Sequence, residues 1–315
     1  DPALRAALLH PSYDPACPNH LSAFNTATAD GVRAYQACVE FLADRYSGTG
    51  ISHGRVAGYI IGNEVNSHWY WYNLGHASME KVAEDYLRAV RMAFYAIRKS
   101  SSSARVYLSL EHHWNIRYPA GSETQSFAAR PFLEHFARQA KASGDFEWHL
   151  AFHPYPENLG QPRTWLDKSA TPLDDTPRVT FRNLDVLVRF MGKDNLLYLG
   201  KPRRIILSEQ GFHSNGTPEG EQAQAAAYAY AYEKVSALDG IDSFILHRHV
   251  DHSKEGGLNL GLWRRLPESI STPSAPKPIY DVFKAAGTSA QADAFAFALP
   301  IIGITDWEPV RAGKR

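Results

Sequence analysis

The chain has 315 residues, of which 44% are hydrophobic, so its length and composition suit one large α/β domain with a sizeable core. Its 33 basic and 33 acidic residues balance, which leaves no field of one sign and argues against nucleic acid or an anionic membrane surface as a partner. No apolar run is long enough to cross a bilayer, so no membrane span is expected.

Short apolar runs alternate with helical patterns along the N-terminal half. A first helix is expected over residues 31–46, followed by a strand at 56–62 whose continuous apolar pattern is typical of burial on both faces. The next elements expected are a helix over 79–97, a strand at 105–110 and a helix over 131–141 that a proline opens.

The same alternation continues through the C-terminal half, with strands of four to six residues and longer helices between them. Segments rich in proline and polar residues, at 158–178 and 258–278, are expected to be loops. The remaining expected elements are a strand at 147–152, a helix at 181–191, a strand at 204–207, a helix at 219–238, a strand at 241–246 and a helix at 279–286.

Alternating strands and helices predict an α/β fold with a parallel sheet, and we interpret the pattern as a (β/α)8 TIM barrel that forms a single catalytic domain over residues 1–315. Five strand–helix units follow the first helix, whereas the complete barrel needs eight. The first strands are therefore missing or cryptic: they lie either outside this sequence or in the poorly patterned stretch at residues 7–24. A smaller open sheet is the other option.

Polar, chemically capable residues follow each expected strand. In a parallel barrel the functional side chains project from the carboxyl ends of the strands, so these residues are expected at one mouth. The five endings are Asn63 and Glu64; Glu111, His112, His113 and Trp114; His153 and Tyr155; Glu209 and His213; and His247, Arg248 and His249.

Glu64 and Glu209 are the two endings that suggest a reaction. Each follows a buried strand, and the order of the strands places both carboxylates at the same end of a parallel sheet. Cleavage of a glycosidic bond needs such a pair, because one carboxylic acid protonates the leaving oxygen while the other carboxylate attacks the sugar or activates water. Each glutamate alone is equally well explained as an ordinary surface residue; the pair is what favours a glycoside hydrolase.

The asparagine–glutamate step at 63–64 and the glutamate three strands later resemble the large barrel clan of retaining glycosidases often called clan A. The resemblance implies that Glu64 is the acid/base at the end of the fourth strand and Glu209 the nucleophile at the end of the seventh. It also implies that Asn63 binds the sugar 2-hydroxyl and that His153 or Tyr155 touches the nucleophile. Many clan members have a tryptophan after the eighth strand, where this chain has His247 and Arg248.

Two longer stretches, His-Pro-Tyr-Pro-Glu at 153–157 and Leu-Ser-Glu-Gln-Gly-Phe at 207–212, resemble a bacterial group known mainly as a domain of unknown function with a predicted glycosidase barrel. That resemblance implies no particular sugar. A poly- or oligosaccharide is the expected substrate, with an anionic one left open.

Sugar rings stack on flat apolar surfaces, so aromatic residues in the expected mouth loops are candidate platforms, although core packing explains any single ring as well. Arginine and histidine there would suit sulfate or uronate groups. The candidate substrate-binding residues are Asn63, Trp69, Trp71, His113, Trp114, His153, Tyr155, His213, His247, Arg248 and Trp263.

Two other functions remain open. A metal-dependent barrel hydrolase would use the mouth histidines, but His112 and His113 alternate along a strand and are not expected to share one ion. No HExxH or cysteine cluster occurs, so no metal site is assigned. The other alternative is a non-catalytic carbohydrate-binding barrel. No phosphate loop or dinucleotide fingerprint occurs either, and no cofactor is expected.

The cysteines and the N-terminus bear on the cellular compartment. Cys17 and Cys38 leave a disulfide open, and the helical pattern around Cys38 equally suits a buried thiol. Asp1 is not an initiator methionine, and the first residues lack the pattern of a signal peptide. Secretion or a periplasmic location is expected if a signal peptide has been removed.

Overall fold

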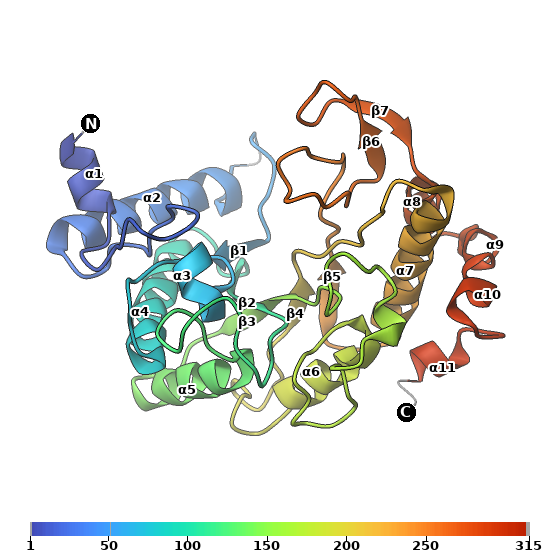
Figure 1. Cartoon of the computed structure of the whole chain (residues 1–315). Coiled ribbons are helices and arrows are strands. Elements are labelled where there is room, and N and C mark those ends of the chain that lie inside the picture. The colour runs from blue at the N-terminus through green and yellow to red at the C-terminus, as the bar shows by residue number, and fades with distance from the viewer. Residues whose placement is uncertain (1, 51, 313–315) are drawn as a thin grey trace. The chain divides into compact units, whose positions relative to one another are not determined.

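The computed structural model of the chain describes residues 2–50 and 52–312 (Figure 1). The chain divides into two compact units, which are described separately below. Unit 1 comprises Asp1–Ala151 and Met191–Arg204, and unit 2 comprises Phe152–Phe190 and Ile205–Arg315. The chain passes between the two units more than once, and the single domain stays a prediction.

Unit 1 contains a parallel pair of strands, β1 (Gly58–Ile61) and β2 (Arg105–Glu111), with Gly58 opposite Arg105. The crossover between them is α4 (Met79–Arg98), which begins where the side chain of Ser78 accepts a hydrogen bond from the backbone N–H of Lys81. One face of α4 is apolar and buried, so the helix packs on the strands as a βαβ unit requires.

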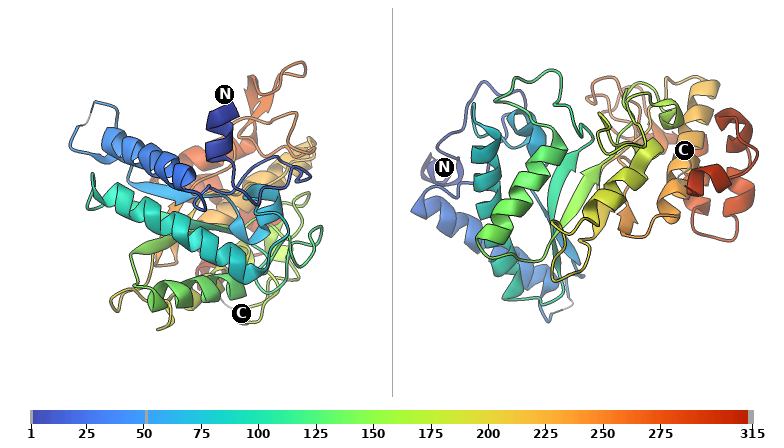
Figure 2. Two further views of the ribbon diagram at one scale, coloured as in Figure 1. Left: turned by 90° about the vertical axis from the view of Figure 1, so that its left-hand side faces the viewer. Right: turned by 90° about the horizontal axis from the view of Figure 1, so that it is seen from below.

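Further helices surround this strand pair. α2 (Ala29–Ser47) packs against α4, and so does α5 (Ala129–Ala142); Figure 2 shows α4 and α5 side by side. Shorter elements complete the unit: α1 (Pro2–Leu8), the 3₁₀ turn η1 (Val65–Ser67) and α3 (His68–Trp71).

Unit 2 contains a second parallel pair, β4 (Ile205–Leu207) and β5 (Ile241–Phe244), joined by α7 (Pro218–Ser236). The side chain of Thr217 caps α7, and proline occupies its first position. The middle of α7 is rich in alanine and tyrosine and is buried on nearly all sides, because the small alanine side chains let neighbours pack closely. α8 (Pro278–Ala285) lies along it (Figure 1).

The remaining elements of unit 2 are short. α6 (Leu184–Met191) follows the 3₁₀ turn η3 (Phe181–Asn183), and η2 (Thr164–Leu166) precedes both. β6 (Trp263–Arg265) and β7 (Pro273–Pro276) form an antiparallel pair. The last helices are α9 (Gln291–Phe295), α10 (Ala298–Ile302) and α11 (Glu308–Arg311).

β3 (Trp148–His153) belongs to both units: its first four residues lie in unit 1 and its last two in unit 2. All six of its residues are buried, as expected for a central strand. The strand order β1-β2-β3-β4-β5 makes one five-stranded sheet in which each strand lies beside its neighbour in sequence. The fold is therefore mixed α/β with a parallel sheet, and the complete eight-stranded barrel stays a prediction.

Most of the expected elements are confirmed, including all five strands. The loop expected at 258–278 was wrong in part, because it holds β6 and β7. The stretch at residues 7–24 holds the end of α1 and a bridge between Leu9 and Phe24, so among the described residues it supplies no cryptic strand. Cys17 is buried, Cys38 is exposed, and both are free thiols, which corrects the expected burial of Cys38. Within the described residues, no helix is long and apolar enough to span a membrane.

Candidate active site

The turn after β1 holds Glu64 in a specific conformation. Gly62 and Glu64 both have positive φ, 74° and 40°, and a glutamate rarely adopts the left-handed region. The backbone N–H of Glu64 donates to Ser109 Oγ at 2.9 Å, so a residue of β2 fixes this turn. The Glu64 side chain is half-exposed, as is Asn63 before it. Such an outlier is typical of functional sites, where surrounding contacts maintain an otherwise costly backbone conformation.

Tyr86 of α4 ties the two strand ends of unit 1 together. Its hydroxyl accepts from the backbone N–H of Ser109 at 2.9 Å and donates to the carbonyl of Ile61. The ring is fully buried, and burial raises the pKa of the Tyr86 hydroxyl well above its usual value. Through these two hydrogen bonds, the neutral Tyr86 hydroxyl fixes the end of β1 relative to β2, just before Glu64.

Glu111, the last residue of β2, lies in a dense hydrogen-bond network. Its Oε1 accepts from Asn66 Nδ2 at 2.6 Å and Ser67 Oγ at 3.1 Å. Its Oε2 accepts from the backbone N–H of His113 at 2.9 Å and pairs with the His113 ring at 2.6 Å. Burial raises the pKa of Glu111, but the hydrogen bond from His113 and the nearby His113 and His112 outweigh it and lower that pKa to about 2.

His112 and His113 both turn toward this carboxylate, with His112 Nδ1 3.5 Å from Glu111 Oε2. The expectation that the two rings point apart was wrong, because β2 ends at Glu111 and strand alternation no longer applies beyond it. The three side chains offer ligand atoms within 4.8 Å of one another, so they could hold a metal ion. The hydrogen bonds already accepted by Glu111 fit a structural carboxylate better than an ion's ligand.

The end of β4 in unit 2 carries Glu209, whose side chain is half-exposed. Tyr155, which follows β3, donates its hydroxyl to Glu209 Oε1 at 3.1 Å. His153, at the end of β3, lies 3.0 Å from Ser208 Oγ through its Nε2. The structure thus brings together three predicted residues from two neighbouring strand ends, and a tyrosine contacts the predicted nucleophile.

The chain following β5 closes tightly on the end of β4. Gln210 accepts from the backbone N–H of His247 at 2.8 Å through its carbonyl, and its side chain donates to the carbonyl of Ile245. A Cβ at position 211 would lie 2.3 Å from the carbonyl oxygen of His247, so only glycine fits at Gly211. The segment that carries His247 and Arg248 is therefore positioned by the backbone next to Glu209.

Arg248 and His247 share one carboxylate that the sequence did not identify. Arg248 Nη2 lies 2.6 Å from Glu255 Oε2, and His247 Nε2 lies 3.3 Å from Glu255 Oε1. The Arg248 Nε is also 3.2 Å from His247 Nε2. The peptide bond between His247 and Arg248 is cis. All three side chains remain partly exposed, at 27%, 27% and 24%.

A buried ion pair supports the same segment. Lys277 Nζ donates to Asp251 Oδ1 at 2.8 Å, and both side chains are buried. Burial lowers the pKa of Lys277, opposed by its hydrogen bond to Asp251. His213 accepts from the backbone N–H of Asn259 at 3.0 Å, and burial lowers its pKa, with Lys277 acting in the same direction. These contacts connect the end of β4 to the chain before β6.

The predicted aromatic platforms differ in exposure. Trp71 is 38% exposed, whereas Trp69 is 6% and Trp114 is 0% exposed. A ring without exposed surface has no face to present to a sugar, so burial counts against Trp69 and Trp114 as platforms in this structure. Trp263 is half-buried, with its ring edge-on to Tyr280 at 5.3 Å. His113 is buried beside Glu111.

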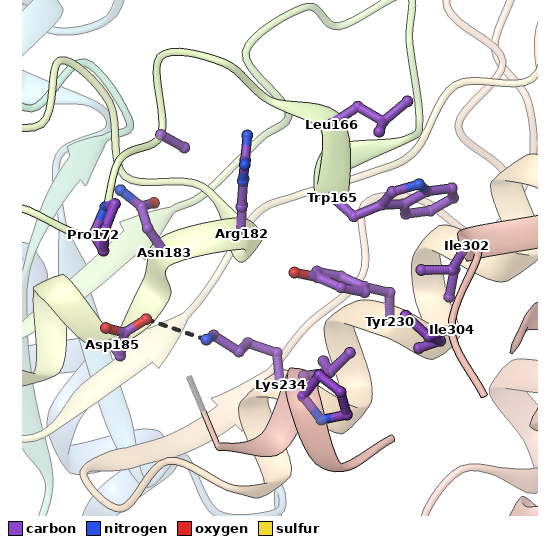
Figure 3. Close-up of a pocket in the computed structure, with 13 residues that line it drawn as sticks. Trp165, Leu166, Pro172, Arg182, Asn183, Asp185, Tyr230, Lys234, Ile302 and Ile304 are labelled. Carbon is purple, nitrogen blue, oxygen red and sulfur yellow. Dashed lines mark ion pairs between the residues drawn. The ribbon is translucent and has the colours of Figure 1, made fainter. Parts of the chain in front are cut away.

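A separate cavity of about 360 Å³ in unit 2 involves none of the predicted site residues (Figure 3). It is lined by Trp165 and Tyr230, whose ring centroids are 5.9 Å apart, and by Lys234, which pairs with Asp185 at 3.1 Å.

The comparisons with known proteins agree with the fold. The model of a family described as "Family of unknown function (DUF5722)" matches residues 2–310. No curated protein matches the chain. A family 39 glycoside hydrolase from Bacteroides cellulosilyticus WH2 is similar, with a TM-score of 0.50, 16% identity, and coverage of 83% of this chain and 44% of that one. A β-glucosidase from Pyrococcus furiosus has a TM-score of 0.50 and 14% identity, covering 86% and 62%.

These identities show a shared fold and nothing further. The chain spans less than two thirds of the length of either structure. The likeness is therefore one of fold alone, and the chemistry has to be argued from the chain's own residues.

Proposed function

The chain belongs to the DUF5722 family, and we propose that it is a retaining glycoside hydrolase that cleaves a poly- or oligosaccharide. One observation carries the proposal: a half-exposed carboxylate, Glu209, follows β4 and receives a hydrogen bond from the Tyr155 hydroxyl at 3.1 Å. A nucleophile needs this combination, because the carboxylate must be oriented by a fixed donor and still be accessible to substrate.

Glu209 is the nucleophile in this proposal and Glu64 the acid/base. A Glu209 oxygen forms a bond to the anomeric carbon while the glycosidic C–O bond breaks, and Glu64 gives its proton to the leaving oxygen. Water then attacks the same carbon, Glu64 takes a proton from that water, and the bond to Glu209 breaks. The sugar is released with its original configuration.

Tyr155 has a positioning role in each step. Its hydroxyl holds Oε1 of Glu209, so we assign the attack to Oε2. Asn63, half-exposed beside Glu64, is assigned to the sugar 2-hydroxyl.

The retaining assignment makes a geometric prediction. Retaining enzymes separate their two carboxyl groups by about 5–5.5 Å, whereas inverting enzymes leave about 6.5–9.5 Å for a water molecule. A crystal structure with a bound inhibitor should show the shorter separation between Glu64 and Glu209. A separation of about 10 Å would contradict the retaining mechanism.

Azide rescue on an aryl glycoside panel tests the two roles. Glu64→Ala should still form the glycosyl-enzyme from a substrate with a good leaving group, and azide should restore turnover with a product of retained configuration. Glu209→Ala should be inactive on every substrate. Glu134→Ala, which removes a half-exposed glutamate from α5, is the matched control and should behave like the wild type. An azide product of retained configuration from Glu209→Ala would exchange the two roles, whereas an inverted azide from Glu209→Ala is the product expected when the nucleophile is missing.

A metal-dependent hydrolase is the second candidate, favoured by the ligand atoms of Glu111, His112 and His113 lying within 4.8 Å of one another. Zinc titration with metal analysis decides between them. One tightly bound equivalent, with activity lost to a chelator, would favour this candidate. Glycan binding without any released sugar would favour a non-catalytic binding protein.

A further inference from the structure

The carboxylate of Glu255 lies in a site that a ligand carboxylate would fit. One of its oxygens is 2.6 Å from the Arg248 guanidinium and the other is 3.3 Å from the His247 ring. Arginine recognises carboxylates through such short, charge-assisted contacts from its planar fork. Arg248 thus contacts one oxygen of the Glu255 carboxylate and His247 contacts the other.

We propose that Glu255 is an internal stand-in for the carboxylate of a uronic acid, and that Arg248 and His247 bind that carboxylate when substrate enters. The proposal rests on the proposed glycosidase function and names its substrate class as acidic sugars. When the ligand arrives, its carboxylate replaces Glu255 on Arg248, and Glu255 turns out to solvent.

The exposure of the ion pair supports this exchange. Both Arg248 and Glu255 keep about a quarter of their surface in contact with solvent, 27% and 24%. Ion pairs with this much exposure contribute little to folding stability, so separating them costs little. A buried pair such as Asp251–Lys277 would resist exchange, because each charge would be left without solvent or partner.

The backbone around Glu255 also permits the movement. Gly256 and Gly257 follow it directly with φ of 59° and 86°, and a Cβ at either position would meet nothing within 4 Å. Glu255 itself is held by short-range turn bonds, from its N–H to the carbonyl of His252 and from Leu258 N–H to its own carbonyl. The side chain can therefore leave Arg248 without disturbing the sheet.

The backbone of His247 and Arg248, by contrast, is held in place by hydrogen bonds. The backbone N–H of His247 is bonded to Gln210 next to Glu209, and the segment beyond Arg248 is bonded to β6 through Asp251 and Trp263. A rigid arginine beside a movable carboxylate is the arrangement that an exchangeable binding site requires. Because His247 is bonded to the residue after the proposed nucleophile, the carboxylate bound there would belong to a sugar near the cleaved bond.

Binding of free monosaccharides tests the proposal without requiring turnover. D-glucuronate and D-galacturonate are titrated by calorimetry or NMR against D-glucose, D-galactose and inorganic sulfate. The uronates should bind the wild type more tightly than the neutral sugars and sulfate, and less tightly at high salt. Arg248→Gln should weaken uronate binding about tenfold or more, because a charge-assisted contact is lost.

Glu255→Gln gives the opposite and more specific result. Removing the internal competitor should strengthen uronate binding by about two- to fivefold and leave neutral sugars unchanged. Glu255→Ala repeats the test should the glutamine itself contact Arg248. Arg189→Gln, which removes an exposed arginine paired with Asp185, and Glu268→Gln, which removes an exposed acid, are the matched controls. Both should match the wild type.

Three outcomes would overturn the proposal. The first is uronate binding no tighter than that of neutral sugars in the wild type and in both Glu255 variants. The second is sulfate binding as tight as that of uronate, which would make Arg248 a general anion site. The third is weaker uronate binding in folded Glu255 variants, which would make Glu255 structural. Uronate binding with no hydrolysis of any uronide would instead contradict the proposed glycosidase and leave the carboxylate site standing.

Discussion

Glu111 at the end of β2 and Glu209 after β4 are both carboxylates at carboxyl ends of strands in the same sheet, yet their surroundings differ. Glu111 is 4% exposed, and hydrogen bonds from Asn66, Ser67 and His113 occupy both of its oxygens. Glu209 is half-exposed and is oriented by Tyr155 on one oxygen.

The difference separates a carboxylate held by several donors from the one that we propose reacts. Every donor around Glu111 stabilises the ionised form, and the lowered pKa of about 2 follows from them. A carboxylate stabilised this well is a poor nucleophile and an even poorer acid. Position at a strand end is therefore not enough to assign catalysis; accessibility and the number of donors decide which glutamate reacts.

The largest expected effect concerns activity. Glu209→Gln keeps the size of the side chain and its contact with Tyr155 but removes the nucleophile, so kcat should fall on the order of 10⁴- to 10⁶-fold. The free energy of unfolding should change by less than about 1 kcal/mol, because the side chain is half-exposed. Steady-state kinetics and urea denaturation measure the two quantities. A stability loss as large as that expected for Glu111 would remove the distinction between the glutamates.

The next effect concerns stability. Glu111→Ala leaves the buried donors of Asn66, Ser67 and His113 without their acceptor, so unfolding free energy should fall by about 3–5 kcal/mol. Glu134→Ala on α5 should change it by less than about 1 kcal/mol. Denaturant titration of both variants is the measurement. An unchanged midpoint for Glu111→Ala would show that its network does not stabilise unit 1.

A third effect appears on acidification. The folded-state pKa of Glu111 is about 2, below its ordinary value of 4.5. Its stabilisation is therefore complete above pH 4.5 and is lost as pH falls toward 2, by roughly 3 kcal/mol. The stability difference between the wild type and Glu111→Gln should shrink over that pH range. A difference that stays constant down to pH 2 would contradict the lowered pKa.

The smallest effect concerns the donor to Glu209. Tyr155→Phe removes one hydrogen bond to an ionised oxygen, so kcat should fall about tenfold while the fold is kept. Tyr95→Phe, on the exposed surface of α4, should have no effect on kcat. An unchanged kcat in Tyr155→Phe would leave Tyr155 with a packing role only.

The fold was largely predictable because its signals are local. A buried parallel strand is a continuous apolar run, and its crossover helix has an apolar face, so β2 and α4 follow directly from residue order. The pair β6 and β7 was not predictable, because prolines within β7 are typical of loops rather than strands. The short helices α9 to α11 carry too little periodicity to be recognised.

The sequence indicated the residues of the candidate site but not their burial or their hydrogen-bond partners. The resemblance to clan A implied that His153 or Tyr155 touches Glu209, and Tyr155 is the residue that donates a hydrogen bond to it. Asn66 and Ser67 lie 45 and 44 positions before Glu111, and no sequence pattern predicts hydrogen bonds over that separation. Glu255 was missed because a glutamate in a glycine-containing turn looks like any solvated charge, and only the fold brings it to Arg248.

The order of the strands also bears on how the chain is made. Because each strand lies beside the next one in sequence, every new strand can add to an edge that the ribosome has already released. Until the next strand is synthesised, the last strand of the growing chain therefore has one edge without a hydrogen-bonding partner. A synthesis pause after β3 would leave unpaired the backbone edge of a strand whose six residues are all buried in the finished fold. Aggregation during expression should therefore depend more on the speed of translation between residues 153 and 205 than on the stability of the finished fold.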